Sequence, residues 1–254
     1  MSTRTIVHAK WRMLRRHLVD ISSIEDVFAN PVLNEQILAV DEDAIDYAAY
    51  CRSVDLSLFA EICNRVAEPT ILERLPRSSV PFLSAKTASQ LLYCMRLMSI
   101  LDVMPIRSVI EIGGGLGNMA RLMLQLGIAS EIHVVDLPEM LLVQRIFWNE
   151  ADVDISRIFQ HDALGAGLSD DLPGGAGLLF SSFAVTEMTP YGRSWVLLDI
   201  APRCRHIYIA GQSRYYGGDD VKSQICAHLN CRPDLNVNDL PYDSNIWPAF
   251  EAYC

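Results

Sequence analysis

Acidic residues and glycines at regular spacing are the part of this sequence best suited to hold a ligand. They read Glu111-x-Gly113-x-Gly115-x-Gly117 and follow a short run rich in β-branched residues at 107–112. A glycine-rich turn between a strand and its helix lets the backbone approach a ligand closely, with helix N–H groups facing it. The plainer alternative is a turn with no ligand, but three alternate glycines preceded by an acid favour a binding site.

The same turn can be compared with the fingerprint of dinucleotide-binding proteins. That fingerprint is G-x-G-x-x-G, and Gly113 and Gly115 fill its first two glycine positions. Asn118 stands where the third glycine belongs. The motif therefore disfavours an NAD-linked oxidoreductase, which is kept as an alternative.

Two more acids follow the next two predicted strands. Asp136 ends the strand predicted at 131–136, about 20 residues beyond the turn, where an acid can accept both hydroxyls of a ribose. Asp162 follows the strand predicted at 155–160, and by itself it would be an ordinary loop acid. Because parallel strands end at one edge of a sheet, Glu111, Asp136 and Asp162 together predict a nucleoside pocket.

The glycine motif with its acid resembles motif I of class I methyltransferases that use S-adenosyl-L-methionine (S-adenosylmethionine). That cofactor carries an ammonium and a sulfonium, and a carboxylate at a strand end favours both cations. In that family an Asp at the position of Asp162 accepts from the adenine amine, and the backbone of its neighbour contacts the ring. The resemblance implies S-adenosylmethionine as cofactor, bound by Glu111, Gly113, Gly115, Gly117, Asp136, Leu137, Asp162, Ala163 and Ser181.

The exit of the fourth predicted strand is similar to that of a narrower group, the bacterial sugar O-methyltransferases. The similarity rests on Ser181-Ser182 with Glu187-Met188, on the Asp136-Leu-Pro138 turn and on Gln144, and it covers about 107–213. That group shows Asn near the position of Ser181, so this sequence departs from it there. The resemblance implies O-methylation of a sugar or another small hydroxylated metabolite, with that small molecule as the partner.

Transfer of a methyl group to a hydroxyl needs alignment and a group that accepts the hydroxyl proton. Glu187 is the first candidate for this base, and His161 and Tyr191 follow. Glu187 has a plainer interpretation as a carboxylate at a helix N-terminus, stabilised by the helix dipole. His161 has one as a loop histidine, and His133 and His206 are interpreted as structural residues at the starts of strands.

The elements that position these residues divide the chain into two sections. Glycine is absent before Gly113, and helices are predicted at 10–20, 34–50, 55–67 and 86–102. We expect residues 1–104 to be a helical section that serves as a lid or in homo-oligomerisation, with Trp11, Leu14 and Leu18 on the apolar face of its first helix. Residues 105–254 alternate strands and helices, which predicts an α/β Rossmann-like, doubly wound, mostly parallel sheet.

The remaining predicted elements complete that sheet. Further strands are expected at 178–183 and 206–210, with helices at 118–126, 138–149 and 193–200. The segment 211–217 is a candidate wall of the substrate cleft. After a helix at 221–229, short strands at 235–237 and 249–253 predict a final hairpin that is reduced in size.

Composition excludes several classes of protein. The chain has 254 residues, 50% of them hydrophobic, and a net charge of −10, which argues against a nucleic-acid partner. No apolar run approaches the roughly 20 residues that a spanning helix needs, and no secretory signal is recognised, so we expect a cytoplasmic protein without a membrane partner. Seven cysteines without a C-x-x-C pair predict free thiols and no metal site.

A non-catalytic adenosyl-binding or scaffold protein is the main alternative to an enzyme.

Overall fold

The computed structural model describes residues 9–38, 46–101, 104–165, 168–215, 219–230, 232, 234–240 and 249–254. Two segments of interest lie partly outside these ranges. They are the N-terminal section, at residues 1–8, and the candidate substrate loop, at residues 216–218.

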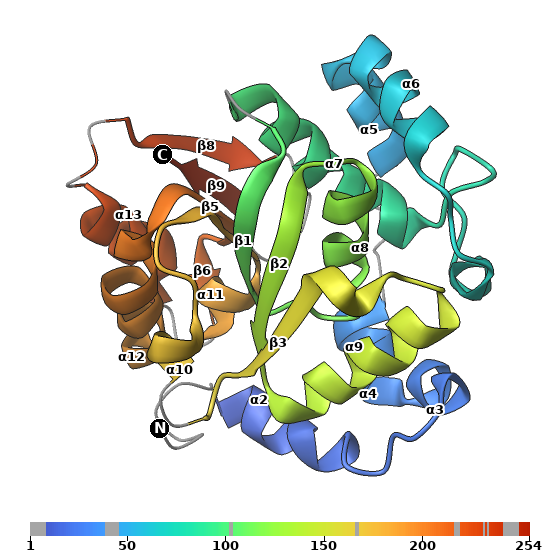
Figure 1. Ribbon diagram of the computed structural model, residues 1–254, viewed down its shortest axis with the longest axis horizontal. Helices are drawn as coiled ribbons and strands as arrows, with labels where there is room; N and C mark the ends of the chain where they lie inside the picture. Colours follow the sequence, from blue (N-terminus) through green and yellow to red (C-terminus); the bar gives the residue numbers. More distant parts are fainter. Residues whose placement is uncertain are drawn as a thin grey trace.

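A seven-stranded sheet in the order β3-β2-β1-β4-β5-β9-β8 forms the centre of the molecule (Figure 1). Strands β1 to β5 are parallel, and β9 is antiparallel to both β5 and β8. This arrangement confirms the predicted Rossmann-like sheet. The strands are β1 (Ile106–Ile112), β2 (Ala129–Asp136), β3 (Ile158–Asp162), β4 (Ala176–Ser182), β5 (Cys204–Gln212), β8 (Asn236–Leu240) and β9 (Ala249–Tyr253).

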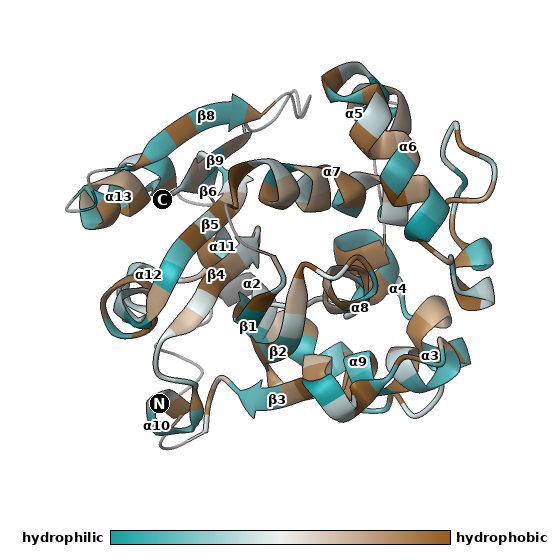
Figure 2. Ribbon diagram, turned by 45° about the horizontal axis from the view of Figure 1, so that its top comes forward, coloured by the Kyte–Doolittle hydropathy of each residue, from teal (hydrophilic) through white to brown (hydrophobic). Residues whose placement is uncertain are grey.

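Helices cover both faces of this sheet. In Figure 2, α7, α8 and α9 lie on one face, and α10, α12 and α13 lie on the other. Strands covered on both faces are apolar almost throughout, and β1 accordingly exposes only Arg107. From α7 onward, the α-helices along the chain are α7 (Ala85–Ile100), α8 (Asn118–Gln125), α9 (Pro138–Glu150), α10 (Leu168–Asp171), α11 (Ala184–Glu187), α12 (Pro190–Trp195) and α13 (Val221–Leu229).

The N-terminal section is built from short helices. It shares one continuous cluster of buried apolar side chains with the sheet. Its elements are α2 (Ala9–Leu14) with the 3-10 helix η1 (Arg15–His17), α3 (Ile24–Ala29), α4 (Pro31–Leu33) with the π-helical η2 (Asn34–Leu38), α5 (Tyr47–Val54), α6 (Leu56–Arg65) and the 3-10 helix η3 (Thr70–Arg74).

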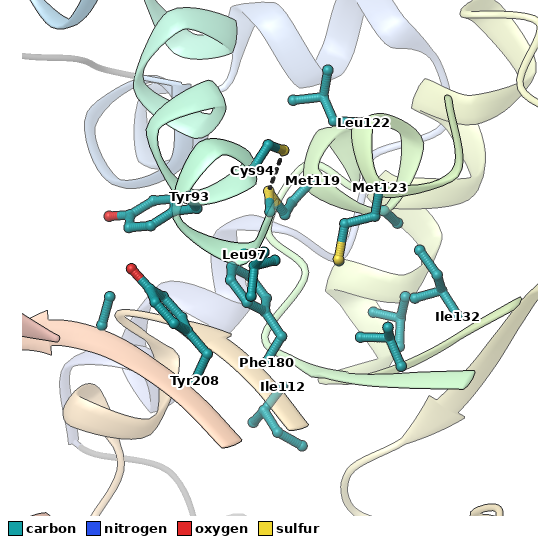
Figure 3. Close-up of a cluster of buried hydrophobic side chains, with 14 of the residues drawn as sticks. Tyr93, Cys94, Leu97, Ile112, Met119, Leu122, Met123, Ile132, Phe180 and Tyr208 are labelled. Carbon is teal, nitrogen blue, oxygen red and sulfur yellow. Dashed lines mark hydrogen bonds between the residues drawn. The ribbon is translucent and has the colours of Figure 1, made fainter. Parts of the chain in front are cut away.

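The junction of the two sections is the packing of α7 against α8 and the sheet (Figure 3). Tyr93 of α7 meets the rings of Phe180 and Tyr208 edge to face, with centroids 6.1 and 6.2 Å apart. Cys94 of the same helix contacts Met119 of α8. Helix α7 therefore holds the start of α8 in place above the parallel strands.

The third strand differs from its prediction. It begins at Ile158, because Ile155–Arg157 forms a 3-10 turn whose N-cap, Asp154, accepts a hydrogen bond from the backbone N–H of Ser156. His161 and Asp162 are therefore the last residues of a strand, and the interpretation of both as loop residues is wrong.

Other bounds also shift. The helix predicted at 34–50 is described as η2 and α5, and residues 39–45 between them lie outside the described ranges. The fifth strand extends to Gln212, and Arg214–Tyr215 (β6) pairs with Asp219–Asp220 (β7), so the start of the candidate substrate loop has strand structure. The final hairpin of β8 and β9 is present rather than reduced.

The glycine turn makes a prediction about stability. A Cβ on Gly117, whose φ is +92°, would lie 2.6 Å from Trp148 Nε1, whereas one on Gly115, at φ +56°, meets nothing closer than 3.7 Å. Gly117→Ala should lower the free energy of unfolding by about 3 kcal/mol, through left-handed strain and overpacking. Gly115→Ala should cost only about 1–2 kcal/mol, from strain alone. Urea unfolding of the two unliganded variants checks this, and equal losses would contradict it.

Candidate functional site

The candidate site lies at the carboxyl edge of β1, β2 and β3. The turn after β1 has Gly113, Gly115 and Gly117 at positive φ, and the N–H of Gly117 donates to the carbonyl of Gly114 over 2.8 Å. These conformations are open to glycine and strained for other residues. They turn the chain sharply from β1 into α8 and leave backbone amides facing the edge of the sheet.

Helix α11 closes one side of this turn. A Cβ on Gly113 would lie only 2.1 Å from the Cβ of Ala184, so only glycine allows the two segments to approach this closely. Because α11 follows β4 directly and ends at Glu187, this contact brings the exit of β4 against the end of β1.

Asp136 links the end of β2 to the same turn. Its Oδ1 accepts from the N–H of Leu137 over 2.8 Å, and its Oδ2 accepts from Gln144 Nε2 over 2.9 Å. The backbone of Gly114 and of Gly115 also hydrogen-bonds to this carboxylate. Burial nevertheless raises the pKa of Asp136 to about 7.

Glu111 is the most unusual group of the site. It is 1% exposed, and its Oε2 has no hydrogen-bond partner. Burial and the nearby charge of Asp136 raise the pKa of Glu111 to about 8. A buried carboxylate without a partner is costly in its charged form, so the site is suited to a ligand that brings a positive charge to it.

Asp162 lies beside Asp136. The two are register partners in β2 and β3, and the N–H of Ala163 donates to the backbone carbonyl of Asp136 over 2.9 Å. Asp162 itself is exposed, and its Oδ1 accepts from the N–H of Leu164. Because Glu111 is in register with Val134, the alternation of side chains places Glu111, Asp136 and Asp162 on one face of the sheet. The structure thus brings together the three acids that the sequence singles out.

Ser181 lies beneath this edge rather than on it. Its side chain is fully buried, donates to the carbonyl of Ile112 and accepts from the N–H of Val185. Both bonds join the ends of β1 and β4 to the start of α11. The hydroxyl therefore supports the site from below.

Glu187 contacts the N-terminal section. Its Oε2 accepts a hydrogen bond of 2.6 Å from Trp11 Nε1. Glu187 is the last residue of the four-residue helix α11 and so also lies in its first turn, as the interpretation of a carboxylate near a helix N-terminus requires. Tyr191, the other residue considered in this region, is 51% exposed in the first turn of α12.

His161 is not brought to this group of residues. It alternates with Gln160 and Asp162 along β3 and so points to the opposite face, where its Nε2 lies 3.0 Å from Nδ1 of His133. Burial lowers the pKa of both imidazoles. The prediction that His133 starts a strand is wrong. His133 lies in the second half of β2 and stacks on Phe159.

Sequence reasoning missed the residues that the N-terminal section contributes. Arg15 donates from Nε and Nη2 to the two carboxylate oxygens of Glu139, over 2.8 and 2.5 Å. The available signal was the spacing of Trp11 and Arg15, which puts both on one face of the first helix. Nothing local in the sequence indicates their partners.

A separate cavity of about 360 Å³ lies at the opposite, amino edge of the sheet. Its wall includes Glu68 and Arg121, whose facing Oε2 and Nη2 atoms are 3.7 Å apart. It contains none of the predicted site residues.

Metal-ligand clusters and membrane-spanning helices are both absent from the part of the chain that the structure describes. No three or more His, Cys, Asp or Glu side chains there come together as metal ligands would. No described helix has both the length and the apolar character to span a bilayer. The six cysteines in the described ranges are free thiols.

Comparison with known proteins leaves the family open and supports the fold. No protein-family model and no curated protein matches the sequence. A precorrin 8W decarboxylase from Methanobacterium thermoautotrophicum has a similar structure, with a TM-score of 0.50, 12% identity, and coverage of 74% of this chain and 98% of that one.

Two methyltransferase structures show weaker similarity. A precorrin-6y C5,15-methyltransferase from Geobacter metallireducens has a TM-score of 0.47 at 11% identity, covering 71% of this chain and 94% of that one. Human N-acetylserotonin methyltransferase, crystallised in complex with S-adenosylmethionine, has a TM-score of 0.43 at 18% identity. The match covers 65% of this chain and 53% of that one. The chain has a Rossmann-like fold, and its likeness to the decarboxylase structure concerns the fold alone.

The buried acids predict how stability depends on pH. Glu111 has its pKa raised from 4.5 to about 8, so over that range the folded protein binds more protons than the unfolded chain. The free energy of unfolding should therefore fall as the pH rises from about 5 to 8. Glu111→Gln should reduce this slope, while the exposed Glu150→Gln should keep it. Urea unfolding of unliganded protein at several pH values measures the slope, and equal slopes in wild type and Glu111→Gln would contradict the assignment.

Proposed function

We propose that the chain is an S-adenosylmethionine-dependent methyltransferase that methylates a hydroxyl of a sugar or another small hydroxylated metabolite. The observation that carries the proposal is the buried, unpartnered Oε2 of Glu111 beside a turn with three glycines at positive φ. The acceptor class rests on the resemblance of the β4 exit to sugar O-methyltransferases.

The residues of the carboxyl edge fit this cofactor. Glu111 would face the ammonium of the cofactor. A cation there would stabilise the charged carboxylate, which burial disfavours and whose pKa it raises. Asp136 would accept from the ribose hydroxyls, because its carboxylate ends β2 beside the glycine turn. Asp162 and the Ala163 backbone, at the end of β3, would contact the adenine. When bound, the cofactor supplies a methyl group activated by its sulfonium.

The contribution of the protein to transfer is alignment and removal of one proton. Glu187 ends α11, the helix whose Ala184 contacts the glycine turn, and it would accept the proton of an acceptor hydroxyl as the new O–C bond forms. The proton goes to the Glu187 carboxylate, and the methyl group replaces it on oxygen. His161, on the opposite face of the sheet, is the weaker candidate for this role.

The surroundings of the site agree with a small-molecule acceptor. The net charge of −10 disfavours nucleic acid, and a cytoplasmic location goes with the free thiols.

Among the two roles considered for the N-terminal helices, covering the site is better supported than oligomerisation. The apolar side of the first helix packs on its own chain, where Leu18 is 1% exposed.

A non-catalytic adenosyl-binding protein is the second candidate, because Trp11 already occupies one oxygen of Glu187. An NAD-linked enzyme has less support. Asn118, which replaces the third fingerprint glycine, is fully buried and donates to Thr87 and Gln90, so it builds the α7–α8 junction.

Cofactor binding is tested first. Calorimetry with S-adenosylmethionine, S-adenosylhomocysteine and NADH should show binding of the two adenosyl compounds only. Asp136→Ala should weaken this binding about 100-fold or more, the loss expected for two hydrogen bonds to a charged group. The fold of this variant should persist, because the substitution removes a carboxylate whose burial costs folding free energy. The exposed Asp199→Ala is the matched control, and unchanged affinity in Asp136→Ala would exclude the pocket.

Transfer is tested next, with a panel of sugars and hydroxylated metabolites. Mass spectrometry should detect a methylated acceptor together with S-adenosylhomocysteine. Glu187→Gln should lower the turnover about 100-fold or more, the usual contribution of a general base, and leave cofactor affinity within about twofold. Cofactor binding without product across the panel would favour the non-catalytic candidate.

A further inference from the structure

The segment α2–η1, the first that the structure describes, contacts the carboxyl edge of the sheet at two points. Trp11 Nε1 donates to Glu187 Oε2 over 2.6 Å, and Arg15 holds both oxygens of Glu139. Trp11 and Arg15 are four residues apart, so both project from the same side of α2–η1. Arg12 and Arg16, each one position further along the chain, are exposed.

The two fastening points lie on either side of the glycine turn. Glu139 is the second residue of α9, which follows β2, and Glu187 ends α11, which follows β4. In the sheet, β1 lies between β2 and β4. A helix joined to both Glu139 and Glu187 therefore crosses the end of β1, and Figure 1 shows α2 beside the start of α9.

A second segment of the N-terminal section approaches the turn itself. A Cβ built on Gly115 would lie 3.7 Å from Cγ2 of Ile37, in η2. After α2–η1, Leu18 is buried against the core and secures the far end of the helix. The turn is thus covered by the chain's own N-terminal residues.

We propose that α2–η1 (residues 9–17) is a strap over the cofactor edge, and that release of the Trp11–Glu187 and Arg15–Glu139 contacts controls entry and exit of the ligand. The identity of that ligand rests on the proposed function, whereas the opening of the strap does not. The strap also joins the two ends of the site, because Glu187, the acceptor-side carboxylate, is one of its fastening points. An acceptor hydroxyl that needs Glu187 Oε2 must displace the Trp11 indole.

Three variants isolate the two contacts. Trp11→Phe keeps an aromatic side chain and removes the N–H donor, and Arg15→Gln removes one end of the ion pair. Arg16→Gln is the matched control, because it makes the same change of charge on the adjacent, exposed residue. Thermal unfolding shows that each variant is folded before the comparison.

The first measurement uses unliganded protein and needs no cofactor. Amide hydrogen exchange of residues 113–118, followed by mass spectrometry, reports how often the strap opens. Exchange should be about tenfold faster in Trp11→Phe, which loses a hydrogen bond to a charged group, and about threefold faster in Arg15→Gln, which loses a partly exposed ion pair. Arg16→Gln should match the wild type. Unchanged exchange in both strap variants would overturn the proposal.

The second measurement follows S-adenosylhomocysteine by stopped-flow fluorescence. Trp148 donates to the carbonyl of Gly117 over 2.9 Å and is a natural reporter of the turn. In the strap variants the association and dissociation rate constants should rise together, by about the factors seen in exchange. Unchanged rate constants would overturn the gate. If wild type does not bind this compound, the proposed cofactor is wrong, and the exchange result alone decides the strap.

Discussion

The arrangement of the site depends on one buried carboxyl group that has an oxygen without a hydrogen-bond partner. Glu111 ends in an oxygen without a hydrogen bond, beside a turn that has three glycines at positive φ. Placing a carboxylate there costs folding free energy, and the raised pKa of both Glu111 and Asp136 reflects that cost. Such a cost is typical of binding sites, where the protein is completed by a ligand of opposite charge.

The rest of the edge is arranged around that carboxylate. Gln144 bridges Asp136 and the carbonyl of Gly115, so the end of β2 and the glycine turn hold each other in position. Ser181 does the same for β1 and β4 from below. These contacts hold the ends of β1, β2 and β4 in a fixed arrangement.

Much of this site was predictable from the sequence, and the reason is local. Glu111, Asp136 and Asp162 each stand at the end of a strand, and the parallel order of the strands places them on one edge. The direction of His161 was not predictable, because the predicted strand ended at residue 160 and side-chain alternation applies only within a strand, whereas β3 continues to Asp162. The contact of Trp11 with Glu187 joins residues 176 apart, and no spacing rule reaches that far.

The order of the strands also gives the edge a gradient of exposure. Asp162 lies on β3, the outermost parallel strand, and is exposed, whereas Glu111 lies on β1 in the interior and is 1% exposed. A ligand that spans these acids would have one end near solvent and the other in a dry environment of low dielectric. Substitutions on β3 would then alter how tightly the outer end is held and leave the electrostatics of the inner end unchanged. Affinity and reactivity could therefore diverge independently in descendants of this sequence.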